Sequence, residues 1–283
     1  MTTAANVKKS ENGHWYAQDG TPAYTVIAKG TGLPRATTLR DARQLGLLPS
    51  VTTILRVLDK PALTAWKIEQ ACLAVLTSPR PAEEPIDTFV ERILKTEKVQ
   101  DQETEAARDR GTEIHAAIED YFQGRTIAPD IEPWVAPAIK ALMPYGELVA
   151  TEKVLVGEGY TGKTDLILQA PACWWLWDFK STKKLPDPTK GGAWSEHRLQ
   201  LAAYAKAFNL ANGEEYPPNT GIRKPVRTAN LYISTVERGN YVICEHEDWM
   251  ATYENGFAPL VRHWSWSTGY TPSSATTPTQ ARD

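Results

Sequence analysis

The chain has 283 residues, of which 42% are hydrophobic and 23% are charged, and its formal net charge is −3. This length can bury a substantial core as one large domain or two small ones. The slight acidity excludes a histone-like coat of positive charge, but it is compatible with a nucleic-acid enzyme whose basic residues lie in one groove.

The three cysteines, Cys72, Cys173 and Cys244, are far apart and form no CxxC pair. They cannot supply an all-cysteine iron–sulfur cluster, and their spacing fits no ordinary zinc site. We interpret them as core thiols of a reducing compartment. No apolar run approaches the length of a membrane span, and the first residues lack the apolar core of a signal peptide. We therefore expect a cytoplasmic protein without a membrane partner.

Residues 1–47 are predicted to form an extension that carries a β-hairpin. Residues 1–12 are polar, and Asp19-Gly20 lies between aromatic and β-branched residues, which is a strong turn signal. The next part, 48–145, is predicted to be mainly helical, with Ser50 as an N-cap and Pro61 in a first helical turn. A proline-rich break separates its first two helices from the others. The helices of this part are predicted over about 51–58 and 61–76 before the break and over about 86–95, 110–122 and 134–142 after it. One more helix is predicted in the extension, over about 37–47.

Residues 146–266 are predicted to form a sheet core with further helices. Two apolar runs flank a turn at 169–172, which is the pattern of a β-hairpin. Together with the helical N-terminal half, this predicts an α/β fold with a central sheet flanked by helices. The tail, 267–283, is rich in Ser, Thr and Pro and is expected to be disordered. Strands are predicted on both sides of this turn, over about 148–156 and, as a second hairpin, over about 228–235 and 241–246. Helices are predicted around Gln200 and over about 247–264.

The hairpin carries charged residues where a core strand would be apolar. Asp165 lies in its first run and Asp178 in its second, and Lys180 follows two residues later on the same face. Acids on neighbouring strands can hold Mg²⁺ or Mn²⁺, with the carbonyl of Phe179 as a further ligand. The lysine can then hold or deprotonate a metal-bound water or stabilise the transition state. The alternative is a surface Asp–Lys pair, but the run CWWLW before Asp178 predicts a strand buried on both faces.

Other residues can complete such a site. His115 and Glu119 lie at i and i+4 on one helical face. Neutral imidazole can bind a divalent metal, and the glutamate can orient it or contact a second ion; a surface His–Glu pair is the alternative. Glu152, one strand earlier, can reach across the sheet or remain an exposed carboxylate. Gly162 precedes Asp165 where a backbone can approach a ligand closely.

The residues after Lys180 are candidates for contacts with nucleic acid. Lys183 and Lys184, with Lys190, lie in a loop rich in Pro and Gly, as expected of a segment that grips phosphates; solvated loop lysines are the alternative. Gln200 can touch a nucleotide or orient Lys180, and Tyr204 can join it or lie in the core. Most tryptophans are predicted core residues. Further candidates are Ser181 and Thr182 as hydrogen-bond donors to phosphate, Trp194 for base stacking, and Ser50 as a phosphate contact or simply a cap.

Four segments in this order resemble the RecB-like branch of the PD-(D/E)XK nuclease superfamily: GTEIHAAIEDYF (111–122), GYTGKTDLIL (159–168), DFKST (178–182) and QLAAYA (200–205). PSVTTIL (49–55) followed by Trp66 extends the resemblance toward phage-type exonucleases and the mitochondrial genome maintenance exonuclease. The resemblance implies a restriction-endonuclease-like core with a mixed sheet, and it makes 48–266 the nuclease domain. It also implies that Asp165 and Asp178 bind the metal, that Lys180 is catalytic and that His115 is a metal ligand, with Gln200 and Tyr204 as the Q-x-x-x-Y element.

The expected function is therefore a Mg²⁺- or Mn²⁺-dependent exonuclease that acts on DNA with a free end and leaves a 5′-phosphate and a 3′-hydroxyl. Asp178 stands where many relatives have Glu, and the cysteine cluster of some relatives is absent, so no iron–sulfur cofactor is expected. The resemblance suggests phage or prophage recombination or replication, with a single-strand-annealing recombinase or another phage replication protein as partner. Two alternatives stay open: an inert DNA-binding accessory protein of the same fold, and a structure-specific or restriction-like endonuclease. The intact D…DxK pattern favours an enzyme.

Overall fold

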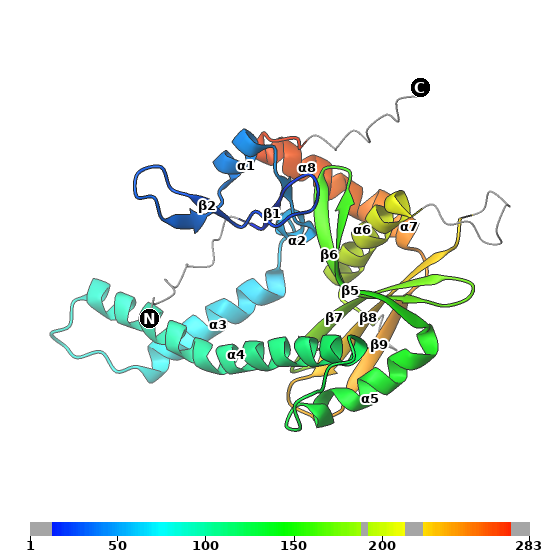
Figure 1. Ribbon diagram of the computed structural model, residues 1–283. Helices are drawn as coiled ribbons and strands as arrows, with labels where there is room; N and C mark the ends of the chain where they lie inside the picture. The colour runs from blue at the N-terminus through cyan, green and yellow to red at the C-terminus, as the bar shows by residue number, and fades with distance from the viewer. Residues whose placement is uncertain (1–12, 188–191, 213–222, 273–283) are drawn as a thin grey trace.

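The computed structural model describes residues 13–187, 192–212 and 223–272 (Figure 1). The predicted loose N-terminus, Lys190 and most of the predicted tail lie outside these residues. The main sheet of the described residues has five strands in the order β5-β6-β7-β8-β9. Its strands are β5 (Glu147–Gly157), β6 (Tyr160–Gln169), β7 (Trp174–Thr182), β8 (Val226–Ser234) and β9 (Tyr241–His246).

The sheet is mixed, as expected. All neighbouring strands are antiparallel except β7 and β8, which are parallel. Parallel neighbours need a crossover connection, and here it contains helix α6 (Ser195–Ala211). The two predicted hairpins, β6–β7 and β8–β9, are confirmed. The α/β class with a mixed central sheet flanked by helices is therefore confirmed.

Helices cover both faces of this sheet. One core joins α6 and the C-terminal helices to Leu176 of β7 and Ile167 of β6. The other joins α4 and α5 to the alternate residues of the same strands, among them Trp177 and Leu166. This alternation is the period of two that strand geometry imposes. Trp174, Trp175 and Trp177 are at most 8% exposed, which confirms β7 as a strand buried on both faces.

The helices agree with the predicted order but differ in one length. The predicted helices over 86–95 and 110–122 are one continuous helix, α4, because the residues between them contain no Gly or Pro and are rich in helix formers. With α3 it forms an arm that extends from the sheet (Figure 1). Helix α4 spans Ile86–Phe122. The other helices lie close to their predicted places: α1 (Leu39–Leu45), α2 (Val51–Leu55), α3 (Pro61–Thr77), α5 (Glu132–Leu142), α7 (Trp249–Thr252), the π-helical Tyr253–Phe257 and α8 (Ala258–Thr268).

The predicted N-terminal hairpin forms, but it is short. The turn at Asp19-Gly20 forms, with the Ala17 nitrogen donating to the Thr21 carbonyl at 2.8 Å. Pairing across the turn is short, through an antiparallel bridge between Tyr16 and Pro22 and a hydrogen bond from the Ala23 nitrogen to the Trp15 carbonyl at 2.8 Å. The longer pairs lie elsewhere: β1 (Trp15–Tyr16) pairs with β4 (Leu48–Pro49), and β2 (Thr25–Ile27) pairs with β3 (Pro34–Ala36). This pairing leaves Trp15 only 1% exposed, within the same core cluster as α6. Burial of this large indole holds the short hairpin against the main core.

Two smaller predictions are also corrected. Of the presumed core thiols, only Cys244 is buried, while Cys72 is exposed on α3. The C-terminal residues up to 272 are placed against the body, since the Tyr270 hydroxyl donates to the Leu47 carbonyl at 2.8 Å. No described helix combines the length and the apolar character that crossing a membrane requires.

Candidate active site

Strands β6 and β7 stop pairing at Leu166 and Trp177, just before the predicted acids. Beyond this point two side chains replace the backbone ladder. The Thr164 hydroxyl donates to the Trp177 carbonyl at 2.7 Å, and the Phe179 nitrogen donates to the Asp165 carboxylate at 2.5 Å. The strands therefore separate where the same register would set Asp165 opposite Asp178. Both acids lie at this opening.

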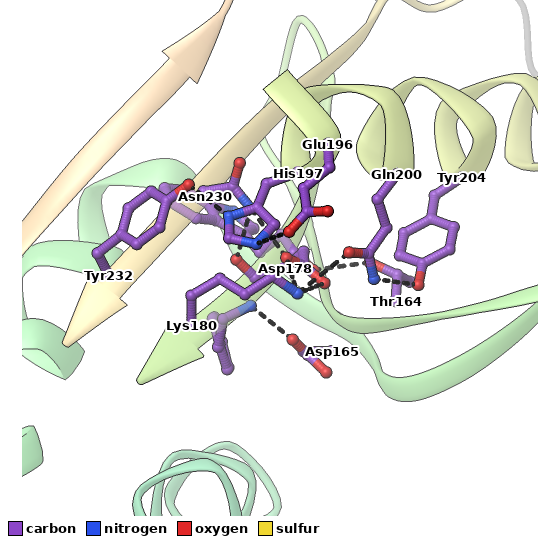
Figure 2. Close-up of polar contacts among 12 residues, drawn as sticks. Thr164, Asp165, Asp178, Lys180, Glu196, His197, Gln200, Tyr204, Asn230 and Tyr232 are labelled. Carbon is purple, nitrogen blue, oxygen red and sulfur yellow. Dashed lines mark hydrogen bonds and ion pairs between the residues drawn. The ribbon is translucent and has the colours of Figure 1, made fainter. Parts of the chain in front are cut away.

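Asp178 is only 3% exposed and is held by two donors (Figure 2). The Lys180 Nζ lies 2.9 Å from its Oδ1 and 2.7 Å from its Oδ2. The Asn230 Nδ2 donates to Oδ2 at 2.8 Å. Burial raises the pKa of Asp178 to about 6, and the charge on Asp165 adds to this effect while Lys180 opposes it. Burial likewise raises the pKa of Asp165. Perturbed pKa values of this kind gather at functional sites.

Lys180 is positioned by α6. Its Nζ also donates to the Gln200 Oε1 at 3.1 Å, and the Gln200 Nε2 donates to the Tyr204 hydroxyl at 2.6 Å (Figure 2). Gln200 and Tyr204 lie one turn apart and are 7% and 3% exposed. Of the two roles considered for Gln200, contact with the lysine is the one present here. Gly162 gives room to the Tyr204 ring, since a Cβ there would lie 2.2 Å from a ring carbon.

Helix α4 reaches the site from the other face of the sheet. The His115 ring lies edge-on to Phe179 with centroids 5.9 Å apart. Burial lowers the pKa of His115 to about 4. The charge of Asp178 opposes this shift, and the charge of Lys180 adds to it. The ring is therefore neutral at physiological pH, which is the form that binds metals. The helix comes close at Gly111, where a Cβ would lie 2.3 Å from the Ser181 Oγ.

The two further glutamates have partners of their own. Glu119 accepts a hydrogen bond from the Gln123 Nε2 at 2.7 Å, and its charge contributes to the raised pKa of Asp165. Glu152 forms an ion pair with Lys163 and has a positive φ of 50°. The register of β5 and β6 sets it opposite Asp165.

The predicted DNA contacts divide by exposure. Lys183, Lys184 and Trp194 are exposed; the Trp194 ring is 45% exposed and lies edge-on to the Tyr232 ring. Ser181 and Thr182 are partly buried, and the Thr182 hydroxyl bonds to the backbone of Lys184. Ser50 is 5% exposed and caps α2 by accepting from the Thr53 nitrogen at 3.0 Å. Burial argues against the predicted DNA contacts of Ser50 and Tyr204.

The donor set at the opening suits a hard divalent cation. Asp165 and Asp178 offer the oxygen ligands that Mg²⁺ and Mn²⁺ prefer. Because the N–H and C=O of a strand residue point to the same edge, the Phe179 carbonyl faces the opening together with its nitrogen. Within the described ranges, no three His, Cys, Asp or Glu side chains form a ready-made metal cage. The arrangement matches the usual Mg²⁺ site, which has one or two carboxylates and completes its shell with water and phosphate oxygens.

Sequence reasoning missed Asn230 and Thr164. Both are completely buried, and both bond to β7 or to Asp178 itself. A signal was present for Asn230, because asparagine is depleted in strands and this one interrupts the apolar run ANLYI. Thr164 offered none, since threonine is common in strands.

Comparison with models of protein families gave no match, and neither did comparison with curated proteins. Two solved structures align with parts of the chain. An alkaline exonuclease from Laribacter hongkongensis aligns with 13% identity and a TM-score of 0.30, over 55% of this chain and 79% of that one. The protein SSO0001 aligns with 15% identity and a TM-score of 0.24, over 47% of this chain and 61% of that one. At these TM-scores neither alignment supports a function, which we infer from the site instead.

Proposed function

We propose that this protein is a divalent-metal-dependent deoxyribonuclease. The observation that supports it most is the convergence of Asp165, Asp178 and Lys180 at the opening between β6 and β7. Asp165 and Asp178 would hold Mg²⁺ or Mn²⁺, with the Phe179 carbonyl as a further ligand. Neutral His115 would have to approach the two acids to bind the same ion, because these three side chains do not form a metal cage in this conformation. Such an ion supplies a Lewis acid that acidifies water and offsets charge on phosphate. Two neighbouring carboxylates with raised pKa values are costly in a purely structural role.

Lys180 is the residue best placed to act on the phosphate. Its side chain is 24% exposed, so it is largely enclosed but still in contact with solvent. An ammonium there can stabilise negative charge that develops on the phosphate or orient the attacking water. Gln200 keeps the ammonium in place, and Tyr204 in turn fixes Gln200.

Residues around the site would supply contacts that do not depend on the DNA sequence. Lys183 and Lys184 would attract the phosphate backbone, and the exposed Trp194 ring would stack on a base. We propose exonuclease action on a free DNA end, leaving a 5′-phosphate and a 3′-hydroxyl, in the recombination or replication of a phage or prophage. A single-strand-annealing recombinase or another phage replication protein is the proposed partner.

Digestion of end-labelled linear DNA, with Mg²⁺ or with EDTA, tests the proposal. We expect the wild-type protein to shorten the DNA only with Mg²⁺, and we expect Lys180→Ala to abolish cleavage while folding and DNA binding persist. A closed circular substrate should remain intact. Equal rates for wild type and Lys180→Ala would remove the lysine from the mechanism, and cleavage of the circle would identify an endonuclease. A wild-type protein that binds DNA without cleaving it would be an accessory protein.

A further inference from the structure

We infer that Asn230 and His246 are positioning residues that orient the Asp178 carboxylate for its cation, an inference that rests on the proposed function. Asn230 lies directly across from Asp178 in the parallel register of β7 and β8 and is completely buried. Its Nδ2 donates to the Asp178 Oδ2 at 2.8 Å and to the Asp178 carbonyl at 3.2 Å. Its Oδ1 lies 2.9 Å from the His246 Nε2. Side chains of three neighbouring strands are thus connected in one chain of hydrogen bonds.

The chemistry of the groups sets the direction of this chain. An ionised carboxylate only accepts hydrogen bonds, so the amino group of Asn230 must face Asp178. Its carbonyl oxygen then faces His246, and the imidazole must carry a proton on Nε2 in order to donate. A flip of the Asn230 amide would set oxygen against oxygen at Asp178. His246 thereby locks the amide in the orientation that Asp178 requires.

The consequence is that the Asp178 carboxylate is fixed in orientation while its oxygens can still bind a cation. Oδ1 receives a hydrogen bond from Lys180 at 2.9 Å, and Oδ2 receives one from Asn230 at 2.8 Å and lies 2.7 Å from the Lys180 ammonium in an ion pair. A carboxylate has about four acceptor sites over its two oxygens, so both oxygens keep free capacity for a cation. Because Asn230 also holds the backbone carbonyl of Asp178, it restricts rotation of the side chain. Partners of this kind orient metal ligands and are nearly as important as the ligands themselves.

The test compares Mn²⁺ affinity, measured by electron paramagnetic resonance without DNA, across a set of variants. Asn230→Leu and His246→Leu should each weaken Mn²⁺ binding by about 10–100-fold. His246→Gln keeps an N–H donor and should restore most of the affinity. Because His246 acts through Asn230, the double Leu variant should bind no more weakly than Asn230→Leu alone. Thr228→Val is the matched control, since Thr228 is completely buried on β8 opposite His246, and it should bind Mn²⁺ like wild type.

Two further readouts separate positioning from general stability. Affinity for DNA in EDTA should be unchanged in all variants, and urea unfolding reports stability independently. If Asn230→Leu does not fold, the Leu and Gln variants of His246, which is partly exposed, provide the test. Leu variants that fold and bind Mn²⁺ like wild type, or a His246→Gln variant as weak as His246→Leu, would overturn the inference while leaving the nuclease proposal intact. A wild-type protein that cleaves no DNA and binds no Mn²⁺ would overturn both.

Discussion

The Asp165 carboxylate on β6 accepts a hydrogen bond from the backbone nitrogen of Phe179 on β7, at 2.5 Å, beyond the point where the two strands stop pairing. The acid thus satisfies a backbone donor that a regular ladder would have satisfied. The same contact keeps its negative charge in the opening, beside Asp178. One residue therefore joins the local structure of the sheet to the proposed cation site, and substitutions can separate the two roles.

Asp165→Asn should separate them. The amide oxygen can still accept from the Phe179 nitrogen, so stability should stay close to that of wild type, while the loss of charge should abolish Mn²⁺ binding and cleavage. Asp165→Ala also loses the hydrogen bond, which should cost about 1.5–3 kcal/mol of stability. Urea unfolding in EDTA and Mn²⁺ titration measure the two effects. If the Asn variant were as unstable as the Ala variant, the hydrogen bond would not depend on an acceptor at this position.

Gln200→Ala should slow cleavage on the order of 100-fold, because a small displacement of Lys180 is enough to misalign it. Tyr204→Phe removes only the acceptor of the Gln200 amide and should have a smaller effect. Single-turnover rates and DNA affinity in EDTA should be measured together. A loss of affinity that matches the loss of rate would instead assign Gln200 to nucleotide binding.

Gly111→Ala should lower activity, because the added Cβ would lie 2.3 Å from the Ser181 Oγ and push α4 away from the end of β7. Overpacking of this kind typically costs about 1–3 kcal/mol. The double variant Gly111→Ala/Ser181→Gly removes the obstacle and should recover activity. Ser181→Gly alone serves as the control for the lost hydroxyl. A double variant as inactive as Gly111→Ala would show that another contact enforces the glycine.

Trp194→Ala should weaken binding of single-stranded DNA by about 1–3 kcal/mol, the usual contribution of one stacked base. The measurement is fluorescence anisotropy in EDTA, which avoids digestion of the probe. Trp266 on α8 is 80% exposed, and Trp266→Ala is the control for removal of an exposed indole. Equal affinities of the two variants would place the DNA elsewhere.

The metal-free protein should lose stability as the pH falls from about 6.5 toward 4. Burial lowers the pKa values of His115, His197 and His246 to about 4, 3 and 4, so between those values and 6.5 the unfolded chain binds protons that the folded chain does not. Asp165 and Asp178 act in the opposite direction, because their raised pKa values let the folded chain bind protons first. The three histidines outnumber the two acids, so the net effect should be a loss of stability on acidification. Urea unfolding in EDTA at several pH values measures the slope, and a gain of stability on acidification would contradict the prediction.

Several features of the site follow from local sequence alone. Asp178 and Lys180 share a face because side chains in a strand alternate, and Gln200 meets Tyr204 because they lie one helical turn apart. Ser50 begins α2 because its hydroxyl caps the next turn. Each of these relationships spans at most four residues, so the pattern of side chains is enough to predict it.

Other features needed the tertiary structure. Asn230 reaches Asp178 because β8 lies parallel to β7, across 52 residues of chain, and His246 follows through the pairing of β9. Likewise, α4 brings His115 to the opposite face only because it is continuous and approaches β7 at Gly111. The sequence by itself determined which residues carry the chemistry along each strand and helix. Only the tertiary structure decided which of them meet, because pairing between distant strands depends on the packing of the whole core rather than on neighbouring residues.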